Sequence, residues 1–278
     1  MPPSERGRIV LGLCVPHTPR IADPASVAPA FQPMVDGMRR ARETLQAHDP
    51  DAVILVSAHW ATTFNPYVDV AEWHRGILTA MECPDILGSI VYDFPGDPEL
   101  GMEIVERARA AGVPAIAVDE PHQVLDYGTI VPVRYLLPDG GVPVVPISSC
   151  PLSSIAEYLT LGAALRDAVA ASGRRVALVA SSAFAHNLVR GPETWPTPSE
   201  RAIDDHLIAL LTRGELGAAR AVLPAFATGA KYEMGGKPVA AMLGALGDDF
   251  RGECYAYGPS SGSGNPVLAF ESLPALAA

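Results

Sequence analysis

Short, unbroken apolar runs alternate with longer segments of mixed polar and apolar residues along most of the chain. In the clearest run, residues 51–60, five consecutive apolar residues lead into a serine, an alanine and a histidine. Similar runs occupy residues 9–15 and 176–181. Apolar runs this short and continuous are typical of strands buried on both faces of a sheet. We therefore expect these three segments to form the centre of one sheet.

The segments between these runs have the spacing of helices. Apolar residues recur on one face of residues 28–47, and Asp97 and Thr197 each precede a proline at a predicted helix start. A strand, a helix and a strand in succession predict a right-handed crossover, with the strands 9–15 and 51–56 as parallel neighbours. Further helices are expected at 99–111, 153–171, 198–211, 215–223 and 239–246, and further strands at 67–70, 113–118, 142–147, 252–257 and 267–270.

Residues 61–100 are less regular, and we expect a long loop there that borders the active site, with His74 on the surface. No linker, repeat or low-complexity block divides the chain. The sequence therefore predicts one catalytic domain over residues 1–278. Its fold class is α/β, with a central, mostly parallel or mixed sheet flanked by helices on both faces.

Composition narrows the functional classes. The 278 residues carry a formal net charge of −11, so we expect neither a nucleic-acid partner nor an anionic membrane surface. No segment reaches the length of a membrane span, and the amino terminus has no signal-peptide core. The four cysteines are far apart and form no CxxC pair, which argues against a structural zinc module and a disulfide scaffold. We expect a cytoplasmic protein.

Histidines follow the predicted strands. His17, His59 and His186 come after the three apolar runs, and His122 follows a fourth strand together with Tyr127. Carboxyl ends of parallel strands meet at one edge of a sheet, so this pattern indicates a metal site there. Two histidines and one carboxylate form the ligand set of many non-haem Fe(II) oxygenases. His122 and Tyr127 are candidates for orienting or proton-transfer groups, and both could equally be ordinary loop residues.

Several of these motifs together resemble the class III extradiol ring-cleavage dioxygenases. The motifs are Val15-Pro16-His17-Thr18-Pro19, Val56-Ser57-Ala58-His59-Trp60, His122 with Tyr127-Gly128-Thr129, Ser181-Ser182-Ala183-Phe184-Ala185-His186, and Tyr232-Glu233. The resemblance extends in order over nearly the whole chain. It implies that His17, His59 and Glu233 bind Fe(II) and that His186 is the acid and base beside the substrate.

The sequence departs from the family pattern at Tyr127, where many members of the family carry histidine. The resemblance implies that Tyr127 donates a hydrogen bond there or that His122 substitutes. A tyrosine at this position is similar to the 2-aminophenol and homoprotocatechuate branches. The implied reaction opens the ring of a catechol or 2-aminophenol with both atoms of O2, in a homo-oligomer or a complex with a related subunit.

Two other interpretations remain open at this point, and two more are disfavoured. The chain could be a non-catalytic subunit of such an enzyme, or a zinc-dependent hydrolase that uses the same three ligands. A serine hydrolase built on Ser181 or Ser182 with His186 is disfavoured, because no Gly-x-Ser-x-Gly elbow is present. A nucleotide-binding domain is disfavoured as well, since no GxGxxG or P-loop follows the first strand.

Overall fold

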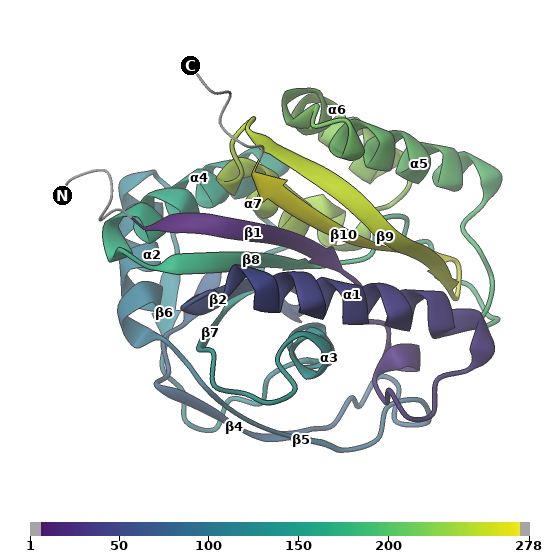
Figure 1. Ribbon diagram of the computed structural model, residues 1–278, viewed down its shortest axis with the longest axis horizontal. Coiled ribbons are helices and arrows are strands. Elements are labelled where there is room, and N and C mark those ends of the chain that lie inside the picture. The colour runs from purple at the N-terminus through teal and green to yellow at the C-terminus, as the bar shows by residue number, and fades with distance from the viewer. Residues whose placement is uncertain (1–6, 273–278) are drawn as a thin grey trace.

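An eight-stranded sheet runs through the molecule, and the computed structural model describes it within residues 7–272. In spatial order the strands are β6 (Ile116–Val118), β3 (Tyr67–Asp69), β7 (Val144–Ser149), β2 (Ala52–Ala61), β8 (Arg175–Ser181), β1 (Arg8–Val15), β10 (Ser263–Ser272) and β9 (Phe250–Ser260). The four strands from β7 to β1 are mutually parallel, whereas β10 and β9 add an antiparallel edge. The sheet is mixed, and the expected fold class is confirmed (Figure 1).

The expected pairing of β1 with β2 is wrong. Both strands run parallel to β8, which lies between them: Leu178 stands opposite Gly12 on one side and Ile54 on the other. The local pattern identified each strand correctly, but strand order depends on pairings between segments more than 100 residues apart. The insertion leaves the three carboxyl ends side by side at one edge of the sheet.

Helices cover both faces of this sheet, as predicted. The helices α1 (Gln32–His48) and α3 (Tyr127–Leu136) lie on one face, below β1 and β8 in the view of Figure 1. On the other face are α2 (Pro98–Ala110), α4 (Ile155–Ser172) and α7 (Lys237–Ala245), and α5 (Pro198–Thr212) and α6 (Leu216–Gly229) lie beside them. Along β1, Leu11, Leu13 and Val15 pack into the core under α1, and Cys14 packs into the opposite core.

The segment 61–100 contains structure that the sequence pattern did not reveal. There β4 (Trp73–Leu78) and β5 (Ile90–Pro95) form a separate two-stranded antiparallel sheet. His74 is not on the surface: it is 5% exposed, packs against Phe94, and its Nε2 lies 3.2 Å from the Val144 carbonyl oxygen. Alternation along β4 turns His74 inward and Trp73 outward, and one histidine among mixed residues does not reveal which face is buried.

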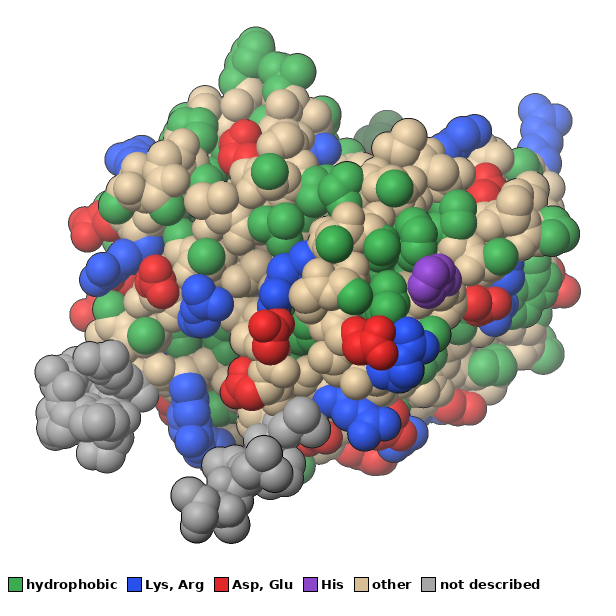
Figure 2. All heavy atoms as spheres, turned by 90° about the horizontal axis from the view of Figure 1, so that it is seen from above, with side chains coloured by type: hydrophobic (Ala, Val, Ile, Leu, Met, Phe, Trp, Pro, Cys, Tyr) green, Lys and Arg blue, Asp and Glu red, His purple; other side chains and the backbone are tan. Residues whose placement is uncertain are grey.

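Acidic and basic side chains lie close together on the surface. Figure 2 shows them interspersed with apolar side chains over one face of the molecule. Ion pairs such as Arg213–Glu215 and Arg220–Asp248 connect neighbouring side chains of opposite charge. Among the described residues, no helix has both the length and the apolarity that crossing a lipid bilayer requires.

Candidate metal centre

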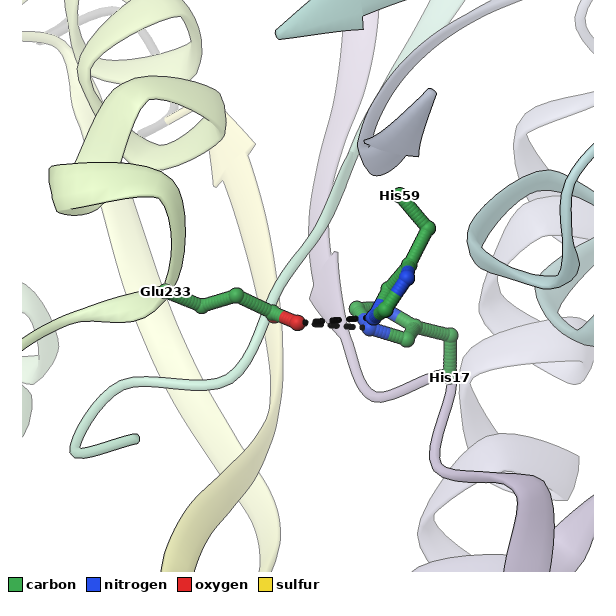
Figure 3. A group of neighbouring side chains, drawn as sticks. All are labelled: His17, His59 and Glu233. Atoms are coloured by element: carbon green, nitrogen blue, oxygen red, sulfur yellow. Dashed lines mark hydrogen bonds and ion pairs between the residues drawn. The ribbon is translucent and has the colours of Figure 1, made fainter. Parts of the chain in front are cut away.

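Three side chains from distant parts of the chain converge beyond the carboxyl ends of β1, β2 and β8. His17 follows β1, His59 lies near the end of β2, and Glu233 begins a short 3-10 turn between α6 and α7. Their ligand atoms all lie within 4.8 Å of one another. Glu233 Oε1 is 3.0 Å from His17 Nε2 and 3.1 Å from His59 Nε2, and Figure 3 shows the carboxylate meeting both imidazoles.

The backbone at each ligand explains this convergence. On its β7 side, β2 has a bulge between Val56, which pairs with Ile147, and Ala61, which pairs with Ser149, while Ser57 still pairs with Ser181 of β8. The bulge turns His59 away from the sheet and toward the strand ends. After Glu233, Met234, Gly235 and Gly236 all have positive φ (46°, 64° and 76°). Glycine adopts this left-handed conformation freely, so the glycine pair permits the sharp turn that presents the carboxylate.

The ligands are held by further hydrogen bonds. Ser181 Oγ lies 2.9 Å from His17 Nδ1, on the side of the ring away from Glu233. The Ala183 amide donates to Glu233 Oε2 at 2.7 Å, which leaves Oε1 for the imidazoles. Partners of this kind orient metal ligands and raise their basicity.

Glu233 is only 4% exposed, and three imidazoles surround its carboxylate. Burial alone would raise the pKa of this carboxyl, but the surrounding imidazoles outweigh burial and hold its pKa well below the ordinary value. An ionised carboxylate in a buried site needs a positive partner. One hard oxygen and two imidazole nitrogens fit a divalent first-row metal ion and leave its other coordination positions open. His17, His59 and Glu233 could therefore hold such an ion.

His186 completes the group. It follows β8, and its Nε2 lies 3.4 Å from Glu233 Oε1. Its backbone forms an isolated bridge with Ser263 of β10 and donates to the Ala230 carbonyl oxygen at 3.3 Å. Burial lowers the pKa of His186, although the charge of Glu233 opposes this shift. A lowered pKa favours the neutral imidazole, which can accept a proton.

Tyr127 lies against the second imidazole. It is the first residue of α3, whose amino terminus is capped by the Asp126 side chain. The Tyr127 hydroxyl is 2.8 Å from His59 Nε2, and the two ring centroids are 3.9 Å apart. Burial and the nearby Glu233 carboxylate raise the pKa of this phenol far above its ordinary value. Tyr127 therefore stays protonated and can donate a hydrogen bond.

The structure does not bring His122 into the cluster. This side chain is exposed in the turn before α3, and its backbone amide donates to Glu120 Oε1 at 3.1 Å. The turn ends at Leu125, which is buried and whose amide donates to the Tyr92 hydroxyl. That anchor directs the following residues, including Tyr127, toward the metal centre and leaves His122 outside.

The cluster lies in a cavity of about 360 Å³, a size typical of sites for a small aromatic molecule. Sequence reasoning missed most of its wall. Besides the four residues around Glu233 Oε1 and Tyr127, the lining consists of Thr18, Pro19, Arg20, Glu82, Cys83, Ile86, Ala183, Leu188, Ser260, Ser261, Ser263 and Asn265. Among these residues, Arg20 could have been identified from the sequence, because it follows His17 by three residues. It also carries a charge that a small polar substrate could bind.

Comparison with known proteins gives consistent results. Residues 11–267 match the protein family described as the catalytic LigB subunit of aromatic ring-opening dioxygenase. The chain is 26% identical to 3,4-dihydroxyphenylacetate 2,3-dioxygenase of Escherichia coli, covering 91% of this chain and 96% of that protein. It is 25% identical to the 2-aminophenol 1,6-dioxygenase beta subunit of Pseudomonas sp, covering 97% and 96%.

A solved structure shares the fold. The crystal structure of an uncharacterized protein from Escherichia coli K12 superimposes with a TM-score of 0.69 and 21% sequence identity. The match covers 95% of this chain and all of that one. At this level of identity, the likeness concerns the arrangement of strands and helices.

Proposed function

Because the chain belongs to the LigB family of aromatic ring-opening dioxygenases, we propose that it is an Fe(II)-dependent extradiol enzyme that opens a catechol or 2-aminophenol ring. One observation carries this proposal. Three imidazole nitrogens surround a single carboxylate oxygen, Glu233 Oε1, at 3.0, 3.1 and 3.4 Å inside a cavity. Two of them complete the metal-ligand set, and the third is free for proton transfer.

The protein's contribution divides among these side chains. His17, His59 and Glu233 would hold the metal. A bound ferrous ion would supply adjacent coordination positions for the two ring heteroatoms and for O2, and a path for electron density between them. Both oxygen atoms enter the product and the ring carbon–carbon bond beside the chelating pair breaks. The substrate itself is therefore oxidised, and no external reductant is needed.

His186 and Tyr127 are proposed to handle the protons. His186 Nε2 accepts the proton from the substrate hydroxyl and returns it after ring opening, a task suited to a neutral imidazole. Tyr127 has the opposite character: its hydroxyl keeps its proton, and with His59 Nε2 taken by the metal it would donate its hydrogen bond to a molecule bound beside that imidazole. His186 is therefore the proposed general base, and Tyr127 is the proposed hydrogen-bond donor.

The test is reconstitution without oxygen. Protein freed of metal is loaded with Fe(II) or with Zn(II), and O2 consumption and the absorbance of the ring-opened product are recorded with a panel of catechols and 2-aminophenols. We expect turnover with Fe(II) and none with Zn(II). Ester or amide hydrolysis by the zinc form would favour the hydrolase interpretation. Absence of O2 uptake with every compound would favour a non-catalytic subunit.

Metal stoichiometry tests the ligand assignment separately. His59→Ala and Glu233→Ala should each retain less than a tenth of the iron bound by the wild type, since a three-residue set has no ligand to spare. His48→Ala is the control, because His48 is an imidazole paired with Glu271 on the surface. Wild-type iron content in either ligand variant would contradict the proposed centre.

We also propose a cytoplasmic enzyme that assembles as a homo-oligomer or with a related subunit. All four cysteines are free thiols, which is typical of a reducing compartment. The match to a beta subunit in Pseudomonas sp supports assembly with a second chain. Light scattering coupled to gel filtration checks this, and a monomer that is fully active alone would contradict it.

A further inference from the structure

Apart from the three histidines, the cavity around the metal centre has one basic side chain among the described residues that line it. This is Arg20, and its guanidinium makes no ion pair with a carboxylate within 4.0 Å and no hydrogen bond in the described part of the chain. Arg20 is half-buried. A charged group in this position is only partly hydrated, so it favours an anionic partner.

The backbone of Arg20 is fixed with respect to the metal ligands. Arg20 lies in a short 3-10 helix, Pro19–Ile21, that begins two residues after His17. Ile21 is fully buried, and its carbonyl oxygen accepts a hydrogen bond from Tyr135 at 2.5 Å. On the other side, the Thr18 hydroxyl bonds the Ser260 hydroxyl at 2.7 Å. These anchors hold the Arg20 backbone at the wall of the same cavity that the metal ligands face, so its side chain lines that cavity.

The acidic side chain on this wall does not neutralise Arg20. Glu82 also lines the cavity, but it is exposed and forms no ion pair with Arg20. Exposed charges are strongly screened by water and salt. The other carboxylate in the cavity, Glu233, already faces three imidazoles. A guanidinium left without a partner in a cavity presents a planar fork of donors that matches a carboxylate.

We infer that the substrate is an aromatic acid, whose ring heteroatoms bind at the metal while a carboxylate on its side chain is received by Arg20. The inference rests on the proposed function for the metal end of the molecule. It goes beyond that function by specifying the charge of the substituent on the aromatic ring, which neither the fold nor the metal ligands determine. Arg20 is thereby assigned as a specificity-determining residue.

Three ligands of similar size and different charge test this inference. They are 3,4-dihydroxyphenylacetate (anionic), 4-ethylcatechol (neutral) and dopamine (cationic). Dissociation constants are measured by calorimetry on the Fe(II)-loaded protein without oxygen, so that binding is separated from turnover. We expect the wild type to bind the acid about 10- to 100-fold more tightly than the neutral compound, the range of a charge-assisted hydrogen bond.

Variants then locate the origin of the preference. Arg20→Gln should reduce the acid-to-neutral affinity ratio to near one, and Arg20→Lys should keep part of it, because an ammonium has the charge without the fork. Arg166→Gln is the matched control. Arg166 is an exposed arginine on α4 that does not line the cavity, and its loss should leave the ratio at the wild-type value.

The outcomes separate the two proposals. Equal affinity for acid and neutral ligand in the wild type, or a preference that persists in Arg20→Gln, would overturn the inference. A preference for dopamine would overturn it as well and would point to Glu82. If Arg20→Gln does not fold, the acid-to-neutral affinity ratio of Arg20→Lys is the test. A ratio equal to that of the wild type would then overturn the inference. Should the acid bind selectively through Arg20 without any ring cleavage in air, the carboxylate site would stand and the dioxygenase proposal would fail.

Discussion

The hydroxyl of Ser181 determines which nitrogen of His17 carries the ring proton. Ser181 Oγ lies 2.5 Å from the Gly128 carbonyl oxygen and 2.9 Å from His17 Nδ1. A carbonyl oxygen can only accept, so the single hydroxyl proton points to Gly128. Ser181 Oγ must then accept from Nδ1–H of His17. In the neutral imidazole the other nitrogen, Nε2, then has the lone pair that a metal ion between His17 and Glu233 would need.

Ser181→Ala should therefore weaken metal binding without removing a ligand. The variant leaves the buried Nδ1–H without its acceptor and frees the imidazole to rotate. Loss of such an orienting partner typically costs 10- to 100-fold in metal affinity, and we expect a decrease of that order. Competition with a chelator of known affinity measures it.

Ser182→Ala provides the control for this prediction. Ser182 is equally buried, but its hydroxyl donates to the Ala183 carbonyl oxygen and touches no ligand. Its metal affinity should stay near the wild-type value. Equal losses in the two variants would show that Ser181 acts only through packing.

Gly128 allows α3 to approach the bulge of β2. A Cβ at this position would lie 2.4 Å from Ser57 Oγ and 3.2 Å from the Cβ of His59. Gly128→Ala should displace the start of α3 and separate Tyr127 from His59. Misplacement by about 1 Å can cost on the order of 10²-fold in rate, and we expect kcat to fall by that order.

Gly217→Ala is the control for Gly128→Ala, because it makes the same substitution in another helix. Gly217 lies in α6, and only the end of Arg220 comes near a Cβ there, at 4.0 Å. This change should leave kcat intact and raise stability slightly, since alanine is the better helix former. If Gly128→Ala kept wild-type kcat, close approach of α3 would not matter for the reaction.

His186→Ala should separate metal binding from turnover. The side chain is not one of the three proposed ligands, so iron content should stay near the wild-type level. The proton acceptor is lost, and kcat should fall about 10²- to 10⁴-fold, the usual contribution of general acid–base catalysis. Iron analysis and steady-state O2 uptake on the same preparation test both parts. Full turnover in the variant would refute this role for His186.

The site was predictable to the extent that it depends on parallel strands. His17, His59 and His186 follow apolar runs, and parallel strands bring their carboxyl ends together whatever their order. Glu233 lies in an irregular turn, so only the resemblance indicated it. The insertion of β8 and the inward face of His74 depend on distant pairings. The exposure of His122 follows from the anchoring of the turn around it, which no local pattern encodes.

Asp204 supports the loop that carries His186 and should make stability depend on pH. It is fully buried on α5, where both carboxylate oxygens lie 3.2 Å from the Ala185 amide and one accepts from the Tyr257 hydroxyl at 2.5 Å. Burial raises the pKa of Asp204 to about 7, against the opposing effects of these hydrogen bonds, the nearby Tyr232 hydroxyl and the charge of Arg201. The group is therefore mainly protonated in the folded protein under mildly acidic conditions.

The sign of the pH effect follows from the two protonation states. Between the ordinary value of 3.8 and about 7, the folded protein holds a proton that the unfolded chain has released. The free energy of unfolding should therefore fall as pH rises through this window, by up to about 1.4 kcal/mol per pH unit, and level off above it. Asp204→Asn removes this contribution. The Tm of the variant minus the Tm of the wild type should therefore increase from pH 5 to pH 7.5. Asp205→Asn, which alters the exposed partner of Arg201 on the same helix, should show a constant difference. A constant difference in Asp204→Asn as well would mean that Asp204 is ionised throughout the window.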